Sequence, residues 1–475
     1  MQRRTKILAT LGPATDDPQT LRKMLAAGVD VVRLNFSHGK AADHAARVAM
    51  VRGTAIELGL DVGILADLQG PKIRIESFAA GSVELQEGQR FTLDTALGAS
   101  AGDETVVGCA YEALPRDVEP GDTLLLNDGA ISMRVDAVED TRVICTVLLG
   151  GVLSNRKGIN KQGGGLSAAA LTDKDRADIR IAAGLDVDFI AVSFPRSAAD
   201  MEQARALVRD AGSDAALIAK IERAEALPVL RELVAASDVV MVARGDLGVE
   251  IGDAELPGWQ KRIIAEAREQ NKMVITATQM MESMINSPVP TRAEVLDVAN
   301  AVMDGTDAVM LSAETATGKY PIKVVQAMAR VCIGAESSLP SLPQRDVRRI
   351  DLHFARTDEA IAMATAWTAR QMRARAIVAL TESGATALMM SRTETQIPIY
   401  ALTRHEKTRR RMALCRDVYP VAFVPSQLES VTQVREAIER LRHRGVLDVG
   451  DRVLLTRGDG FGSGGTNTMK IIQVE

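Results

Sequence analysis

The chain has 475 residues, of which 46% are hydrophobic and 25% are charged. This composition is typical of a soluble globular protein with more than one domain. The formal net charge is -5, with acidic and basic residues mixed along the chain, so nothing in it indicates nucleic-acid or membrane binding. The four cysteines are scattered without a CxxC pair, and no segment reaches the roughly 18 apolar residues of a membrane span. We therefore expect a reduced, cytoplasmic protein.

The N-terminal part alternates short apolar runs with stretches of helical period, which is typical of parallel βα units. The runs TKILATLG, VVRLNFS and GILADLQG are separated by predicted helices near 18–27 and 40–58. The rhythm resumes with a predicted helix at 172–183 and the runs FIAVSF, ALIAKIE, VVMVARGD, MVITATQM and AVMLSAE. Eight strands in about 245 residues favour a closed (β/α)8 barrel over an open nucleotide-binding sheet.

Two other regions have different patterns. Between 70 and 165 we find short strand-like runs with turn signals and no convincing helix, which predicts an all-β insertion. The stretch SSLPSLPQRDVRR predicts a linker, and beyond it strands alternate with helices near 356–373, 384–392 and 429–443. We therefore predict a barrel domain at 1–69 and 166–340, an all-β domain at 70–165 and an α/β domain at 341–475.

The predicted strands end in polar residues almost everywhere. In a (β/α)8 barrel these carboxyl ends form the active site. The residues are Arg33, Asn35, Ser37, Asp67, Ser193, Lys220, Glu222, Arg244, Asp246, Thr276, Thr278, Ser312 and Glu314. One charged strand end would be unremarkable, but their convergence predicts a catalytic site.

The run ALIAKIE ends with Lys220 and Glu222 two residues apart, on one face of a strand. Alone, the pair is compatible with a core salt bridge, a Schiff-base lysine, or a metal ligand beside a cation. Glu222 and Asp246 follow consecutive strands and are oxygen ligands of the kind magnesium prefers, although both could instead pair with Arg33 and Arg244. Cations beside a metal suit phosphoryl transfer.

The loop ARGDLG places Gly245 directly after a strand, where a ligand can approach the backbone. If a helix begins there, the amides of Gly245 and Asp246 would suit a substrate carboxylate. A simple turn is the alternative.

At these residues the chain resembles the pyruvate kinase family along nearly its whole length. The matching stretches, in order, are TKILATLGPA, VVRLNFSHG, ADLQGPKIR, AKIERAEA, VMVARGDLGVE, ITATQMMESM, PTRAEVLDVANAVMDGTDAVMLSAETATGKYP and TNTM. The resemblance implies a barrel with a β-barrel lid inserted after its third strand, and a C-terminal effector domain. It also implies a glycolytic homotetramer that transfers the phosphoryl group of phosphoenolpyruvate to ADP, giving pyruvate and ATP.

The resemblance assigns roles to individual residues. Arg33 would contact the substrate phosphate, Lys220 the transferring phosphoryl group, and Glu222 with Asp246 the magnesium ion. The face shared by Lys220 and Glu222 would then be directed at the substrate rather than reflect mutual pairing. The substrate carboxylate would be held by Gly245, Asp246 and Thr278.

Thr278, together with Ser312, would lie on the route of the proton that converts enolpyruvate to pyruvate. The nucleotide would lie near Asn35, Arg74 and Lys157. For Lys157 the alternative is a solvated hinge.

The sequence departs from the family where many members hold potassium. The resemblance places Asn35, Ser37 and Asp67 in that pocket, but Leu68 stands at a threonine position and Lys72 at a glutamate position. Replacing an anion by an ammonium inside a closed cleft is worth several kcal/mol, as an order of magnitude. Our hypothesis is that Lys72 acts as an internal cation and potassium is not required. An ordinary surface lysine is the alternative.

A second departure concerns regulation. The run LTESGATALMMSR resembles a family loop that binds an effector phosphate. The candidate residues are Thr381, Ser383, Gly384 and Thr386. Glu382 stands where some members regulated by fructose bisphosphate have lysine, which favours a sugar monophosphate or AMP. Helix capping by Ser383 is the alternative.

Two nearby segments carry weaker expectations. The loop GDGFGSGG at 458–465 could fold over an effector or simply connect two strands. The run RHEKTRRR at 404–411 is expected to be a solvated helix face or a subunit contact.

Two other functions remain open from the residues alone. A class I aldolase-like lyase would use Lys220 as a Schiff-base nucleophile, but it leaves the acidic and nucleotide-side residues unexplained. A catalytically inactive metabolite sensor would keep the fold but predicts a damaged active site.

Overall fold

A computed structural model describes residues 2–339, 354, 356–427, 430–458 and 465–475. Most of the predicted linker and the centre of the loop GDGFGSGG lie outside these residues. The chain divides into two compact units. The first comprises Met1–Ala66, Leu185–Phe189 and Ala267–Glu475, and the second comprises Asp67–Gly184 and Ile190–Glu266.

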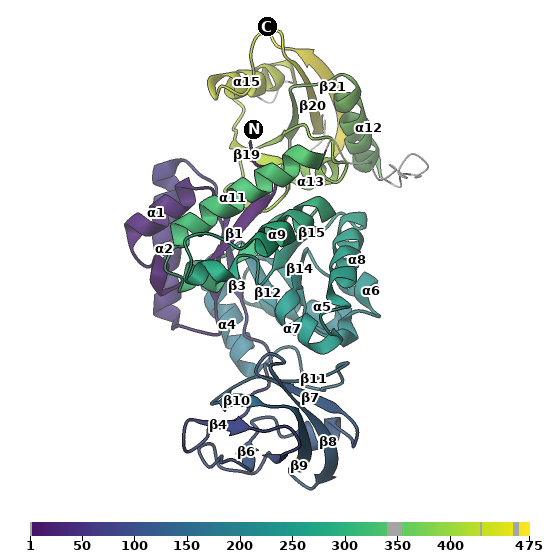
Figure 1. Cartoon of the computed structure of the whole chain (residues 1–475). Helices are drawn as coiled ribbons and strands as arrows, with labels where there is room; N and C mark the ends of the chain where they lie inside the picture. The colour runs from purple at the N-terminus through teal and green to yellow at the C-terminus, as the bar shows by residue number, and fades with distance from the viewer. Residues whose placement is uncertain (1, 340–353, 355, 428–429, 459–464) are drawn as a thin grey trace. The chain divides into compact units, whose positions relative to one another are not determined.

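Eight parallel strands form a closed barrel in the order β1-β16-β15-β14-β13-β12-β3-β2 (Figure 1). They are β1 (Lys6–Thr10), β2 (Val31–Asn35), β3 (Gly63–Asp67), β12 (Phe189–Val192), β13 (Ala216–Ile221), β14 (Val239–Ala243), β15 (Met273–Ala277) and β16 (Ala308–Leu311). Most of their residues are buried, as expected when both faces of a parallel sheet are covered. The predicted barrel is confirmed.

Helices follow these strands, and some of them begin at clear capping residues. In the first unit they are α1 (Pro18–Ala26), α2 (Ala41–Leu58), α9 (Arg292–Asp304), α10 (Ala313–Ala316) and α11 (Pro321–Ser338). The others are α4 (Asp173–Gly184), α5 (Ala198–Asp210), α6 (Leu230–Ala235), α7 (Arg244–Ile251) and α8 (Leu256–Glu269). The Asp17 side chain accepts the Thr20 N–H at the start of α1, and Thr291 and Glu294 form a capping box at the start of α9.

The insertion, in the second unit, is built mainly from antiparallel strand pairs, with a parallel pair at one edge. Six strands form the sheet β11-β7-β8-β9-β5-β6, and β10 pairs with β4. Their bounds are β4 (Ser82–Leu85), β5 (Arg90–Asp94), β6 (Val106–Gly108), β7 (Thr123–Leu126), β8 (Ile131–Glu139), β9 (Arg142–Leu149), β10 (Gly151–Ser154) and β11 (Ile159–Lys161). The expectation of no helix here is wrong, because the short helix α3 (Leu114–Asp117) is present. Four residues are too few to give a periodic pattern.

The C-terminal part of the first unit is an α/β domain with strand order β19-β18-β17-β20-β21. The strands are β17 (Ala376–Leu380), β18 (Ile399–Thr403), β19 (Val418–Ala422), β20 (Arg452–Gly458) and β21 (Thr466–Gln473). The helices are α12 (Thr357–Gln371), α13 (Ala385–Ser391), α14 (Glu406–Met412) and α15 (Ser430–His443). Only the last pairing, β20 with β21, is antiparallel among the pairs of this sheet.

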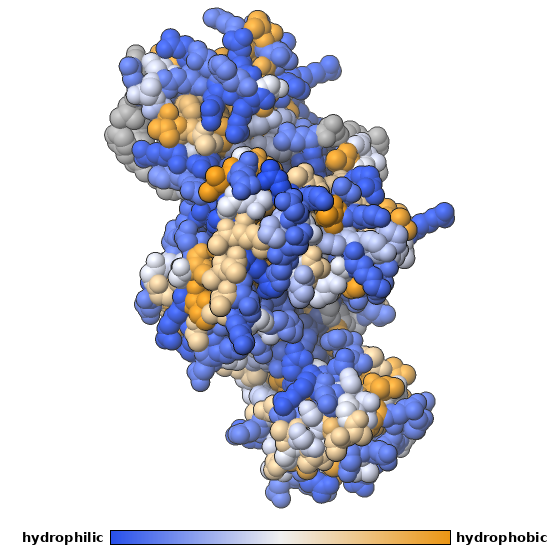
Figure 2. Space-filling view, turned by 90° about the vertical axis from the view of Figure 1, so that its left-hand side faces the viewer, coloured by the Kyte–Doolittle hydropathy of each residue, from blue (hydrophilic) through white to orange (hydrophobic). Residues whose placement is uncertain are grey.

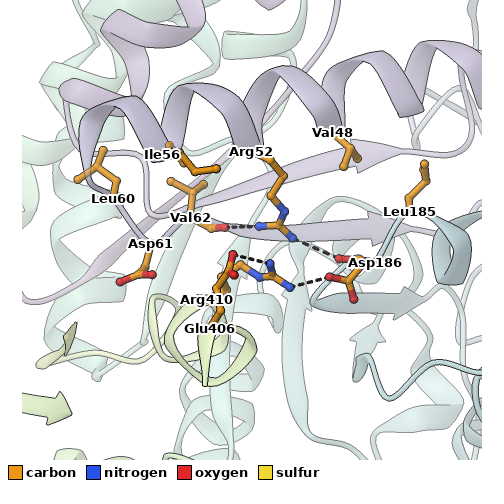
Figure 3. Close-up of a pocket in the computed structure, with 11 residues that line it drawn as sticks. Val48, Arg52, Ile56, Leu60, Asp61, Val62, Leu185, Asp186, Glu406 and Arg410 are labelled. Atoms are coloured by element: carbon orange, nitrogen blue, oxygen red, sulfur yellow. Dashed lines mark hydrogen bonds and ion pairs between the residues drawn. The ribbon is translucent and has the colours of Figure 1, made fainter. Parts of the chain in front are cut away.

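The basic run forms α14, and the expectation of a solvated face is wrong for its central arginines. Arg410 Nε lies 2.7 Å from Asp188 Oδ1, and another of its nitrogens lies 2.8 Å from Asp186. Arg409 pairs with Asp61 at 3.0 Å. Figure 3 shows Arg410 beside Asp186, at a cavity of about 280 Å³ with apolar walls from α2. The run therefore contacts barrel residues of the same unit.

The surface in Figure 2 is mostly hydrophilic, with hydrophobic residues in small groups. None of the helices in the described ranges combines the length and apolar character needed to cross a bilayer.

Candidate active site

Lys220 lies at the end of β13 among polar groups of the second unit. Its Nζ is 2.9 Å from Glu222 Oε1, 3.3 Å from Asp67 Oδ1 and 2.7 Å from Ser193 Oγ. The expectation that Lys220 and Glu222 do not pair is therefore wrong, because alternate strand residues share a face and the lysine reaches back to the carboxylate. The partners come from the ends of β3, β12 and β13, as the strand-end pattern predicted.

Glu222 is 2% exposed and accepts a hydrogen bond of 2.9 Å from the Phe194 N–H. Burial raises the pKa of its carboxyl group, Lys220 opposes this effect, and the negative charge of Asp246 adds to it. A carboxylate that is destabilised by burial and by a second carboxylate gains most from a bound cation. Glu222 and Asp246 therefore fit a magnesium ion, which commonly takes two carboxylates and completes its shell with water and substrate oxygens. Among the described residues there is no group of three or more potential ligand side chains.

Asp246 lies in the first turn of α7, which begins at Arg244. The expected helix start at Gly245 is therefore present, and its dipole favours an anion at this end. Lys72 Nζ lies 3.1 Å from Asp246 Oδ1 and 3.7 Å from Asp128 Oδ1. The lysine thus lies among carboxylates, with its side chain 25% exposed.

Arg74 and Lys157 lie on adjacent segments that connect the insertion to the barrel. Arg74 bridges to Gly158, its guanidinium donates to the Arg156 carbonyl, and the Ile75 N–H donates to the Lys157 carbonyl. Two of the three predicted nucleotide residues therefore lie on paired segments at the base of the insertion.

In the first unit, Arg33 extends from β2 and donates to Thr10 Oγ1 at 3.1 Å. Asn35 Oδ1 accepts the Ser37 N–H at 3.1 Å, which fixes the turn after β2. Arg33 is only partly buried, and its position at the carboxyl end of β2 suits a phosphate contact.

Thr278 directly follows β15 with an unusual backbone. Its φ is 68°, and that of Gln279 is 54°. Positive φ is rare for a β-branched residue and stores strain of about 1–3 kcal/mol, typically at functional sites. The hydroxyl donates to the Ala277 carbonyl at 2.6 Å. The strained turn therefore favours a functional role for Thr278.

Ser312 and Glu314 follow β16. Glu314 is 2% exposed and accepts the N–H groups of Ser312 at 2.6 Å and Met281 at 3.3 Å. Burial raises the pKa of Glu314. Its carboxylate therefore links the loop after β15, which contains Thr278, to the loop after β16.

Comparison with known proteins decides the family. Residues 2–325 match the family described as "Pyruvate kinase, barrel domain", and residues 359–472 match "Pyruvate kinase, alpha/beta domain". The chain belongs to the pyruvate kinase family. It is 55% identical over 478 residues to "Pyruvate kinase II" of Salmonella typhimurium, covering all of this chain and 99% of the relative. It is 50% identical over 477 residues to "Pyruvate kinase" of Haemophilus influenzae, again covering all of this chain and 99% of the relative.

The chain is thus a pyruvate kinase, a phosphotransferase of a family that typically depends on magnesium. Its C-terminal domain contains the predicted effector loop. The Gly384 N–H donates to Thr381 Oγ1 at 2.9 Å, and the Ala385 N–H reaches Ser383 Oγ at 3.5 Å. Thr386 is buried and shares a 2.7 Å hydrogen bond with Thr466 of β21. Its hydroxyl therefore has a partner within the domain.

Glu382, in the same loop of this pyruvate kinase, is held by two side chains. It contacts His405 and lies 3.4 Å from Arg404. The Thr408 hydroxyl also donates to its carbonyl at 2.8 Å. The loop is thus tied to α14 through Glu382.

One buried residue beside the proposed site was not predicted from the sequence. Glu250, on α7, is 5% exposed and contacts both the insertion and the segment after Glu222. The available signal was a carboxylate within the otherwise apolar run LGVEI. It does not follow a strand directly, so the strand-end pattern did not include it.

Proposed function

We propose that this pyruvate kinase transfers the phosphoryl group of phosphoenolpyruvate to ADP, giving pyruvate and ATP, and does so without potassium. The Lys220 cluster carries the catalytic part of the proposal. An ammonium group held by Ser193, Glu222 and Asp67 has a fixed position and a fixed charge. Such a preorganised charge stabilises a transferring phosphoryl group.

The other residues take the roles implied by the family. Arg33 binds the substrate phosphate, and Gly245, Asp246 and Thr278 bind the substrate carboxylate. Glu222 and Asp246 hold magnesium, which when bound neutralises charge on the phosphoryl oxygens. Thr278 and Ser312 lie on the proton route, and Asn35, Arg74 and Lys157 contact the nucleotide.

The aldolase alternative is not supported by the same cluster. A Schiff-base lysine must attack with a free amine, whereas Lys220 Nζ is paired with two carboxylates within 3.3 Å. A coupled assay with phosphoenolpyruvate, ADP and magnesium tests the catalytic proposal. Absence of pyruvate formation would favour the inactive sensor.

The potassium-independent part rests on the ion pair between Lys72 and Asp246. The Lys72 ammonium group lies 3.1 Å from the carboxylate of Asp246. In this proposal it supplies the positive charge that relatives obtain from potassium. The lysine contacts Asp246 and Asp128, while Asp67 is engaged by Lys220. The proposal is therefore that the positive charge of Lys72 replaces the charge of potassium.

Activity measured in potassium chloride and in tetramethylammonium chloride tests this proposal. We expect equal rates for the wild type, and at least a tenfold stimulation by potassium for Lys72→Glu. Lys23→Glu, an equal charge change on the exposed face of α1, is the control and should show no stimulation. Collapse of wild-type turnover without potassium would contradict the proposal.

For regulation, we propose a sugar monophosphate or AMP as activator, bound near Thr381, Ser383, Gly384 and Thr386. The carboxylate of Glu382 in this loop disfavours a second phosphate. Comparing ribose 5-phosphate, glucose 6-phosphate, AMP and fructose 1,6-bisphosphate side by side tests the site. A homotetramer is proposed from the family alone, and light scattering after gel filtration would measure its mass.

A further inference from the structure

Helix α7 carries Asp246 in its first turn and Glu250 one turn later. The side chain of Glu250 makes two hydrogen bonds in different directions within the second unit. Oε2 accepts the Ala224 N–H at 2.8 Å, and Oε1 accepts Asn160 Nδ2 at 3.3 Å. The Glu250 carbonyl also accepts the Gly163 N–H at 2.9 Å.

The first of these bonds links two elements that carry the proposed magnesium ligands. Ala224 follows Glu222 by two residues, in the turn after β13. Asp246 lies on α7 itself. The Glu250 carboxylate therefore fixes the chain after Glu222 against the helix that presents Asp246.

The second bond reaches the sheet of the insertion. Asn160 belongs to β11 and stands opposite Leu125 of β7. Because β7 is a strand of the six-stranded sheet, a side chain on a barrel helix holds the insertion directly. Neighbouring groups hold the following residues in the same way: Glu225 accepts the Gly165 N–H, and Arg223 donates to the Leu166 carbonyl at 3.0 Å.

Lys72 makes the corresponding contact from the other connecting segment, since it pairs with Asp246. Helix α7 is thus held at its first turn by the segment that enters the insertion and at its last turn by the segment that leaves it. A carboxylate at 5% exposure is costly to bury, and an apolar residue would pack there at lower cost. Its presence needs a task besides packing.

We propose that Glu250 is a positioning residue for phosphoryl transfer, coupling the placement of Glu222 and Asp246 to the attachment of the inserted domain through Ala224 and Asn160. The inference rests on the magnesium roles proposed above. It assigns Glu250 no contact with the substrate. Its effect is exerted through the two proposed ligands and through the hinge.

Three variants separate the parts of this proposal. Glu250→Ala removes both side-chain bonds. Glu250→Gln keeps an acceptor for the Ala224 N–H and, after rotation of the Asn160 amide, a partner for that residue as well. Asn160→Ala removes only the bond to the insertion. Glu232→Gln, on the exposed side of α6, is a matched control.

Three properties are measured. Electron paramagnetic resonance gives the affinity of the folded protein for Mn²⁺. Hydrogen exchange is measured in peptides covering 156–171 and 222–228, and steady-state kinetics give kcat and the KM for ADP. We expect Glu250→Ala to weaken Mn²⁺ binding at least tenfold, lower kcat and speed exchange in both peptides. Glu250→Gln should remain within about threefold of the wild type. Asn160→Ala should speed exchange only in 156–171, raise the KM for ADP at least threefold and weaken Mn²⁺ binding, though by less than Glu250→Ala does.

A merely structural role would lower the melting temperature of Glu250→Ala while leaving Mn²⁺ affinity and KM unchanged in the folded enzyme, and that result would overturn the proposal. An equal loss in Glu250→Gln would also overturn it. If Glu250→Ala does not fold, unchanged KM and exchange in Asn160→Ala overturn it instead. Glu222→Gln distinguishes failure of the proposed magnesium role from failure of the coupling. If Glu222→Gln still binds Mn²⁺ normally, the proposed magnesium role is wrong. If only Glu250→Ala binds Mn²⁺ normally, the coupling alone is rejected.

Discussion

Glu250 also leads to a prediction about how the stability of the protein depends on pH. Burial, with a smaller contribution from Glu225, raises the pKa of Glu250 to about 7, although its hydrogen bonds from Ala224 and Asn160 oppose the rise. In the unfolded chain the pKa returns to about 4.3. Between these values the folded protein binds more protons at Glu250 than the unfolded chain does, so this group makes the protein less stable as pH rises. Glu250→Gln removes the effect.

The size of the effect follows from the displacement of the pKa. Since one pKa unit corresponds to about 1.36 kcal/mol, Glu250 lowers the unfolding free energy by about 4 kcal/mol when pH rises from about 4 to above 7. Thermal unfolding of the wild type and Glu250→Gln, measured at intervals from pH 5 to pH 8.5, checks the prediction. We expect the melting temperature of the variant, relative to the wild type, to increase by several degrees up to about pH 7.5 and then level off.

Glu232→Gln, exposed on α6, should show a difference from the wild type that does not vary with pH. A flat difference for Glu250→Gln would show that the carboxylate is not destabilised by its surroundings, and the argument from burial would be wrong. A difference that falls with rising pH would indicate that the ionised form is the favoured one.

Three further changes have defined outcomes. Arg392→Met removes the partner of the fully buried Asp307 and should lower the unfolding free energy by about 3–5 kcal/mol. As a control, Arg404→Met disrupts an exposed ion pair and should lower it by less than about 1 kcal/mol. Denaturant titration measures both. Lys220→Met should lower kcat by at least about 10²-fold with far-ultraviolet circular dichroism unchanged, because it removes a fixed positive charge from the proposed site. Thr278→Gly should relieve backbone strain at a φ of 68° and leave the melting temperature unchanged or higher, while kcat falls; a lower melting temperature would contradict the strain argument.

The barrel was predictable because its parallel strands are buried and therefore continuous in apolar residues, as in β13 and β14. The residues at the strand ends could be named for the same reason, since each follows an apolar run. Helix α3 could not be predicted from its four residues. The burial of Arg410 was also missed, because it depends on Asp186 and Asp188, more than 200 residues earlier in the chain.

The least predictable property was which side chains of the proposed site contact one another. Lys220 and Glu222 were expected to face the substrate separately, yet Lys220 Nζ contacts Glu222, Asp67 and Ser193. A flexible lysine can reach several neighbours, and sequence spacing does not say which of them it selects. Lys72 was noticed only because it differs from the family, and its partner Asp128 lies in a turn of the insertion with a φ of 55°.

These contacts hold helix α7 at both of its ends. Lys72 acts on its first turn, and Asn160 and Gly163 act on its last turn through Glu250. A displacement of either connecting segment therefore changes the surroundings of a helix that begins with Gly245 and Asp246. Because Glu250 also holds the chain after Glu222, the displacement would alter the relation between the two proposed metal ligands rather than either one alone. Under our proposal, the position of the inserted domain and the placement of the two proposed magnesium ligands are therefore coupled through Glu250, although this carboxylate does not follow a strand directly.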